Sequence, residues 1–145
     1  MWIDQRGSEV LSKPECLRLL ALAARRLEVG RLAYCVPGER APVIQPVNFV
    51  YRDQSVLVAL GAGSVADAAS RGPISFEVDG FESSKNEAWS VLVRGFAVPF
   101  KGAQIAVSQE FWPRPLVPRP GRQIFVIRID VVTGRRFVIG EPALT

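Results

Sequence analysis

The hydrophobic positions of this chain change their spacing once, close to residue 30. Before that point they recur every three or four residues, as on one face of a helix, at Leu17, Leu20, Ala24 and Leu27. The letters SKPE at 12–15 form a capping-box pattern with a proline in the first turn, which is typical of a helix start. We therefore predict a helix over residues 13–27 that packs on a sheet, with Gly30 as its stop signal.

After residue 30, apolar and polar residues alternate, which is the pattern of strands with one buried face. Turn sequences such as PG and RDQS divide the alternating runs. We predict strands over 31–36, 47–52, 56–60, 74–79, 89–98, 123–132 and 135–140, with short helices over 65–70 and 102–111. The proline-rich run that follows excludes regular structure there. The strand spacing suits a closed antiparallel barrel, in a single domain over residues 1–145.

Several individual positions have simple structural interpretations. Asp79 ends an alternating run, so we expect it to cap a turn. Arg135 and Arg136 follow the letters TG and are expected to be exposed charges after a hairpin turn. Cys16 and Cys35 lie in apolar patterns and are expected to be buried, since two cysteines are too few for a disulfide framework or a zinc cluster.

Composition narrows the classes of function. Hydrophobic residues make up 48% of the chain and charged residues 22%, which is ordinary for a globular protein. The net charge of +4 comes with scattered arginines, so no nucleic-acid interface is expected. No apolar run approaches the roughly 20 residues of a membrane span and no signal peptide is recognised, so we expect a cytoplasmic protein that does not enter a membrane.

The sequence contains no histidine. Ser-His-Asp and Cys-His nucleophile activation, histidine acid–base catalysis, the usual zinc sites and histidine-ligated haem are therefore excluded. Any chemistry has to come from a bound cofactor, or from carboxylates, tyrosine and lysine.

Six short segments occur in an order and spacing that resemble a known family. They are GRLAY at 30–34, PVNFVY at 46–51, GAGS at 61–64, FEVD at 76–79, WSVLVRGFA at 89–97 and VTGRRF at 132–137. Together they resemble the pyridoxamine 5′-phosphate oxidase-like family over about residues 9–139. The resemblance implies the FMN-binding split-barrel fold, here a mainly β, six- or seven-stranded antiparallel split barrel with two or three peripheral α-helices.

The resemblance also implies a homodimer with a small-molecule ligand in the cleft between two barrels. That ligand is FMN in many relatives, whereas others bind a deazaflavin or haem, so the fold alone does not fix the cofactor. The flavin ring would lie against Pro46, Val47, Asn48 and Phe49, with Trp89 and Ser90 in a later segment near it. Asn48 is either a ring-contacting amide or a solvated side chain. Trp89 is equally open to a role in core or dimer packing.

The phosphate of the flavin would be held by the turn that includes Gly63 and Ser64, whose backbone N–H groups and following helix favour an anion. Relatives typically read FRTGAGSKLDAA where this chain reads VALGAGSVADAA. Ala59, Leu60 and Val65 therefore stand where arginine, threonine and lysine are common. Because each charge-assisted contact contributes about 1.5–3 kcal/mol, we predict a degraded phosphate site. The alternative is a turn that only caps a helix.

Arginines elsewhere in the chain are candidates to replace the missing contacts, namely Arg52, Arg71 and Arg94. Arg94 is also open to a simpler interpretation as a solvated or ion-paired side chain on a strand.

Two functions from different classes follow from these features. The first is an FMN- or deazaflavin-dependent oxidoreductase, in which the cofactor supplies the chemistry and the protein orients it. The second is a non-enzymatic split-barrel dimer that has lost FMN and binds another small ligand or none. True pyridoxine 5′-phosphate oxidation is not expected, because the chain lacks a recognisable set of basic residues for a second phosphate.

Overall fold

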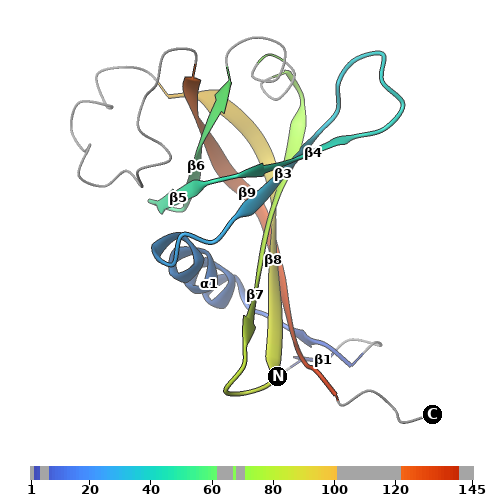
Figure 1. Cartoon of the computed structure of the whole chain (residues 1–145), viewed down its shortest axis with the longest axis vertical. Coiled ribbons are helices and arrows are strands. Elements are labelled where there is room, and N and C mark those ends of the chain that lie inside the picture. Colours follow the sequence, from blue (N-terminus) through green and yellow to red (C-terminus); the bar gives the residue numbers. More distant parts are fainter. Residues whose placement is uncertain (1, 4–6, 62–66, 68–70, 101–121, 141–145) are drawn as a thin grey trace.

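The computed structural model describes residues 2–3, 7–61, 67, 71–100 and 122–140. One helix, α1 (Lys13–Arg25), lies against a curled antiparallel sheet (Figure 1). The strands are β1 (Trp2–Ile3), β2 (Glu9–Val10), β3 (Gly30–Tyr34), β4 (Val43–Val47), β5 (Phe49–Arg52), β6 (Ser55–Gly61), β7 (Pro73–Glu82), β8 (Glu87–Pro99) and β9 (Arg122–Val138).

The sheet runs in the order β1-β2-β9-β8-β7-β3-β4, and every pair in it is antiparallel. Off this path, β6 pairs with both β5 and β9. This architecture confirms the predicted mainly β, antiparallel split barrel. Of the further predicted helices, 102–111 lies outside the described residues, and 65–70 is described only at Asp67, which is helical. No helix in the described ranges is long and apolar enough to cross a membrane.

The core fills the space between the sheet and α1. On the sheet, alternate residues turn inward and are completely buried, as at Val56, Val58, Leu60, Phe76, Val78, Val91, Val93 and Ile127. The helix contributes Cys16, Leu19, Leu20 and Ala23 to the same cluster. The predicted apolar stripe is therefore rotated by about one residue: Leu17 and Ala24 pack only at its margin, and Leu27 is 60% exposed.

The first turn of α1 follows the predicted capping pattern only in part. The hydroxyl of Ser12 accepts a 3.3 Å hydrogen bond from the backbone N–H of Glu15, as an N-cap does. The Glu15 carboxylate binds Arg18 and Arg136. The side chain that would close the capping box thus ties the helix to the sheet.

The helix ends earlier than predicted, and Gly30 is not its stop. The N–H of Glu28 donates to the carbonyl of Ala23 at 3.0 Å and that of Leu27 to Ala24 at 3.2 Å, which is the Schellman pattern. Leu27 occupies the left-handed position of this motif, with φ of 56°. Gly30 instead begins β3, where a Cβ would lie 2.4 Å from the ring of Phe76.

Leu27→Gly is expected to raise the free energy of unfolding by about 1 kcal/mol, because glycine adopts the left-handed conformation without the steric cost that a leucine carries. Because the Leu27 side chain is 60% exposed, removing it loses little buried apolar surface. Urea denaturation measures the change. Leu27→Ala is the matched control, since it removes the same side chain and keeps the Cβ; a glycine variant no more stable than the alanine variant would contradict the argument.

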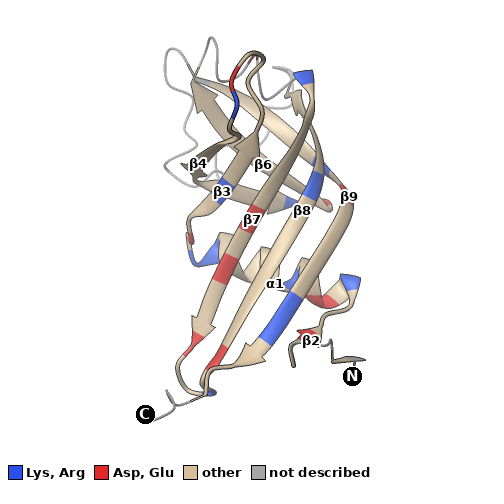
Figure 2. Ribbon diagram, turned by 90° about the vertical axis from the view of Figure 1, so that its right-hand side faces the viewer, with Lys and Arg blue, Asp and Glu red and all other residues tan. Residues whose placement is uncertain are grey.

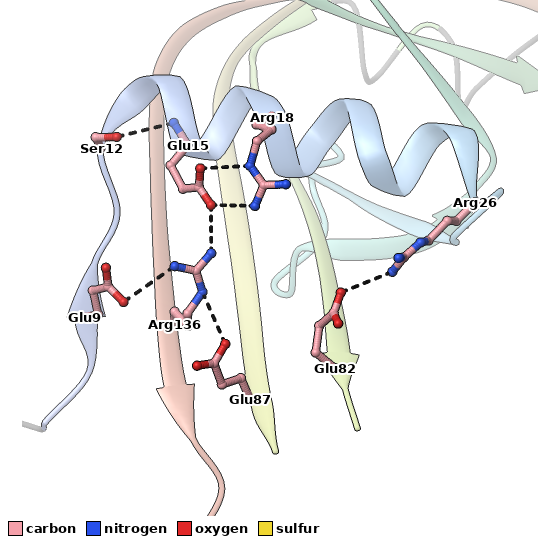
Figure 3. Close-up of polar contacts among 8 residues, drawn as sticks. All are labelled: Glu9, Ser12, Glu15, Arg18, Arg26, Glu82, Glu87 and Arg136. Carbon is pink, nitrogen blue, oxygen red and sulfur yellow. Dashed lines mark hydrogen bonds and ion pairs between the residues drawn. The ribbon is translucent and has the colours of Figure 1, made fainter. Parts of the chain in front are cut away.

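Arg136 joins three elements at one end of the sheet (Figure 3). Its guanidinium donates a 2.7 Å hydrogen bond to the Glu15 carboxylate on α1. It also lies 3.6 Å from a carboxylate oxygen of Glu9 on β2 and 3.8 Å from one of Glu87 on β8. Arg18 approaches the same Glu15 carboxylate to 2.6 Å. The Arg136 side chain is only 23% exposed, so the prediction of an exposed charge is wrong for this residue.

Three other local predictions are also wrong. The letters TG do not form a turn, because β9 continues through Gly134, which is buried where a Cβ would lie 2.7 Å from Sγ of Cys16. Asp79 does not end its strand; it lies within β7 and contacts Arg31. Cys16 is buried as expected, whereas Cys35 is exposed.

Candidate ligand site on the outer face of the sheet

The strands β4, β3, β7, β8 and β9 present one side to the core and the other to solvent. Residues paired across neighbouring strands point to the same side, so each register row contributes a line of side chains. Two such rows on the solvent side are Ile44-Ala33-Ser75-Arg94-Val131 and Pro46-Arg31-Glu77-Leu92-Thr133. We call this side, which also includes Phe96 and Val98 further along β8, the outer face.

Large hydrophobic side chains gather on the outer face. Their exposed fractions are high, as in Ile44 (68%), Phe96 (54%), Val131 (51%), Val98 (42%) and Leu92 (37%). Isolated exposed hydrophobic residues are ordinary, but several on one face of a sheet are typical of an interaction surface.

Besides Arg128 and Arg135 on β9, the outer face carries two sets of charged groups that bear on the site. On β3 and β7, Nη1 of Arg31 lies 3.3 Å from a carboxylate oxygen of Glu77 and 3.3 Å from one of Asp79. Burial raises the pKa of Glu77, and the neighbouring Asp79 raises it further against the opposing effect of Arg31. The ribbon in Figure 2 shows the acidic positions along β7 and basic ones on β8 and β9. The second set lies around a hollow.

The hollow is an open depression of about 460 Å³ between the start of β7, the middle of β8 and β9, and the β3–β4 connection. Its walls are mainly apolar, from Ala33, Pro42, Pro73, Phe96 and Val131. Its polar groups come from Cys35, Ser75, Arg94 and Asp130. This volume and the mixture of apolar walls with a few polar groups are typical of small-molecule sites.

A β-bulge shapes the floor of the hollow. Arg94 pairs with Val131 and Gly95 pairs with Ile129, so Asp130 is left without a partner residue on β8. The strands come so close here that a Cβ on Gly95 would lie 2.4 Å from the backbone oxygen of Arg128. Bulges redirect side chains and are frequent beside functional sites. This one turns Asp130 into the hollow that Arg94 also lines.

Arg94 and Asp130 are both exposed and lie at the same hollow. Neither makes a hydrogen bond or an ion pair with any residue among those that the structure describes. A guanidinium with five donors and a carboxylate that only accepts are therefore both open to a ligand.

The sequence-predicted site residues divide between the two sides of the sheet. Pro46, Asn48, Ala59 and Ser90 are exposed or half-buried. The side chains of Val47, Phe49, Leu60 and Trp89 are buried in the core. Gly63, Ser64 and Val65 lie outside the described residues.

The contacts of the buried members explain their position. The ring of Phe49 packs edge-on against Phe76 with centroids 4.9 Å apart. The indole of Trp89 fills the space beside Gly80, where a Cβ would lie 2.5 Å from it. Leu60 is completely buried, so a threonine there would direct its hydroxyl into the core. These side chains pack in the core of the barrel. Ala59 and Leu60 are the two described positions where relatives carry phosphate-binding side chains, and of these only Ala59 is not buried.

The three candidate arginines lie in different surroundings. Arg52 lies 3.6 Å from Asp53, and Arg71 lies 3.0 Å from Asp67. Arg94 alone of the three lines the hollow. Sequence reasoning named Arg94 but missed Asp130, Ser75 and Phe96. The one available signal was Gly95 inside an otherwise regular strand, since glycine in a strand often marks a bulge.

The fold and the outer face define a split-barrel protein with a ligand-sized hollow on its sheet. The sequence model of the pyridoxamine 5′-phosphate oxidase family matches residues 12–136. The chain therefore belongs to this family. No match was found among curated proteins.

Solved structures with the same fold include two that are named for a flavin. The FAD-binding protein from Mycobacterium smegmatis is 30% identical, with a TM-score of 0.70 over 89% of this chain and 99% of that one. The FAD-binding protein from Mesorhizobium loti is 22% identical, with a TM-score of 0.67 over 90% and 98%. A Corynebacterium glutamicum protein named as a candidate pyridoxamine 5′-phosphate oxidase is 24% identical, with a TM-score of 0.74 over 97% and 100%.

Proposed function

We propose that the chain is a flavin-binding protein that carries its cofactor on the outer face of the sheet and acts as an oxidoreductase. The observation that carries this proposal is the hollow on that face, with apolar walls and two charged groups that have no partner among the described residues, in a chain 30% identical to a protein named for FAD binding. A bound flavin would supply the redox chemistry. The chain's own residues would hold the ring, shield it from water and orient it.

The walls of the hollow suit a flavin ring. A flavin ring system is planar, with an apolar end and a polar end, and the hollow offers both kinds of wall. FMN is the cofactor that the family resemblance implies, and the names of two structural relatives make FAD the second candidate. A deazaflavin has the same planar shape and is the third.

We also propose that a second copy of the chain covers the outer face, which makes the protein a homodimer. The exposed Ile44, Leu92, Phe96 and Val131 support this, because an interface buries such side chains at its centre. The hollow lies among these residues, so a partner subunit would cover a ligand that one subunit alone leaves exposed to solvent.

We propose the reducing cytoplasm as the compartment. The two cysteines are free and one of them is exposed, which fits such a compartment.

One observation favours the alternative of a non-enzymatic split-barrel dimer that has lost FMN. Of the two described positions where relatives carry phosphate-binding side chains, Ala59 has no donor and Leu60 points into the core. A protein of this type would use the same hollow for another small ligand or leave it empty. Oxidation of pyridoxine 5′-phosphate is not part of either proposal.

Absorbance distinguishes the two functions. We expect the purified protein to bind FMN or FAD, seen as a yellow protein or as quenching of flavin fluorescence during titration, with a dissociation constant in the micromolar range or below. A colourless protein that leaves both flavins unquenched would support the alternative.

Sedimentation tests the dimer in the same samples. Leu92→Glu, at the centre of the outer face, is expected to shift the protein to monomers, because a charge buried at an interface is strongly disfavoured. The control is Val138→Glu, a 68% exposed residue on the opposite side of β9. A native protein that is monomeric at micromolar concentration would contradict the dimer.

A further inference from the structure

The floor of the hollow carries two opposite charges that do not neutralise each other. Arg94 from β8 and the bulged Asp130 from β9 line the same depression, and no ion pair joins them in the described part of the chain. An ion pair on a surface gains little stability, because holding two long side chains in one geometry costs conformational entropy. Here both residues line the space between the apolar walls, with the bulged Asp130 next to Val131, the residue paired with Arg94.

This pair of groups selects a particular kind of ligand. A simple anion is attracted by Arg94 and repelled by Asp130. A simple cation is attracted by Asp130 and repelled by Arg94. A neutral ring that presents a carbonyl oxygen beside an N–H satisfies both, since guanidinium groups only donate and carboxylates only accept. Phe96, Pro73 and Val131 provide the apolar surface on which a planar ring would lie.

An imide edge, C(=O)–N–H–C(=O), has this arrangement, and the pyrimidine end of a flavin ring carries one. We propose that the hollow binds the imide edge of the flavin, with Arg94 donating to a ring carbonyl oxygen and Asp130 accepting from the ring N–H. This inference rests on the proposed flavin function and adds the recognition contact to it. The proposal makes Arg94 and Asp130 determinants of ligand specificity, a role that the sequence analysis gave to neither residue.

Recognition through the ring has a consequence for ligand choice. Ala59 contributes no charge to a phosphate, so the affinity of the protein would come mainly from the hollow. Riboflavin, which has the ring and no phosphate, is then expected to bind within about tenfold of FMN. A site anchored by two charge-assisted phosphate contacts would instead lose about 3–6 kcal/mol, or more than a hundredfold, when the phosphate is absent.

Fluorescence-quenching titrations with riboflavin, FMN and FAD test the proposal. Arg94→Gln and Asp130→Asn are each expected to weaken riboflavin binding by about 10- to 100-fold, the range for a hydrogen bond to a charged group. The matched controls are Lys85→Gln in the β7–β8 hairpin and Asp53→Asn beside β6, which remove the same charges from exposed positions away from the hollow. Both controls are expected to bind as the native protein does.

A chemical variant of the ligand tests Asp130 without changing the protein. 3-Methylriboflavin has no imide N–H, so the native protein is expected to bind it about as weakly as Asp130→Asn binds riboflavin. If riboflavin binds but the methyl group and both substitutions have no effect, the imide contact is wrong and the flavin function stands. If riboflavin, FMN and FAD all fail to bind, the proposed function fails together with this inference.

Discussion

Gly95→Ala is expected to lower the free energy of unfolding by about 3 kcal/mol, within the upper range for forcing an atom into a packed site. The added Cβ would lie 2.4 Å from the backbone oxygen of Arg128, which cannot rotate away as a side chain can. Either β8 or β9 must therefore move at the bulge. Urea denaturation measures the loss of stability, and flavin titration measures the accompanying change in the hollow.

Gly61→Ala provides the matched control, because this glycine is also in a strand and no atom of the described residues, its chain neighbours aside, lies within 4 Å of its added Cβ. Its stability is expected to stay within about 1 kcal/mol of the native protein, with a small gain from the stiffer unfolded chain. Equal effects of the two substitutions would mean that the close approach at the bulge does not constrain the sheet.

Arg136→Gln is expected to lower the free energy of unfolding by about 2 kcal/mol at pH 7. The substitution leaves Glu9, Glu15 and Glu87 near one another without their shared cation. The estimate lies between the small contribution of exposed ion pairs and the large cost of breaking buried ones, since these side chains are about a quarter exposed. Thermal and urea denaturation measure it.

The loss should depend on pH in a defined direction. Hydrogen bonds from Arg18 and then Arg136 hold the pKa of Glu15 at about 2, against 4.5 for the ordinary side chain. A carboxyl whose folded pKa is lowered stabilises the protein above its unfolded pKa, and this contribution disappears as the pH falls from about 4.5 to 2. The difference between native protein and Arg136→Gln is therefore expected to be constant above about pH 5 and to shrink below it.

Arg26→Gln is the control for this second prediction. Nη1 of Arg26 lies 3.5 Å from a carboxylate oxygen of Glu82, and the Arg26 side chain is 52% exposed. We expect a change below about 0.5 kcal/mol, as for most surface pairs. If the two arginine variants lose the same stability, or if the loss at Arg136 persists unchanged at pH 3, the ion pairs of Arg136 with its three glutamates do not stabilise the contact between α1, β2 and the sheet.

The fold was predictable from the sequence because its signals are local. The change from helical to alternating spacing near residue 30 identified α1 and the strands after it, and the order of six motifs identified the barrel. The errors arose where a distant contact overrides a local signal. TG resembles a turn, yet Gly134 continues β9 because β8 pairs with it and Cys16 packs on it.

The site was less predictable, because alternation does not say which side of a strand is buried. The motif positions Val47, Phe49, Leu60 and Trp89 were correctly placed in strands, but their side chains turn into the core. The hollow depends on a one-residue register shift between β8 and β9. In the sequence, Asp130 looks like an ordinary residue of an alternating strand. Only the pairing of β9 with β8 shows that it is the extra residue of the bulge.

The strand β9 has a consequence for the order in which the chain assembles. It pairs with β8 along most of its length, with β6 at one end and with β2 at the other. Until residues 122–138 have been synthesised, β6 and β8 each keep an unpaired edge, and Arg136 is not there to hold α1 and β2. Contacts between segments so far apart in sequence form slowly, and unpaired edges invite association with other chains. We therefore expect β9 to pair late in folding, and the nascent chain to be most prone to aggregation just before it does.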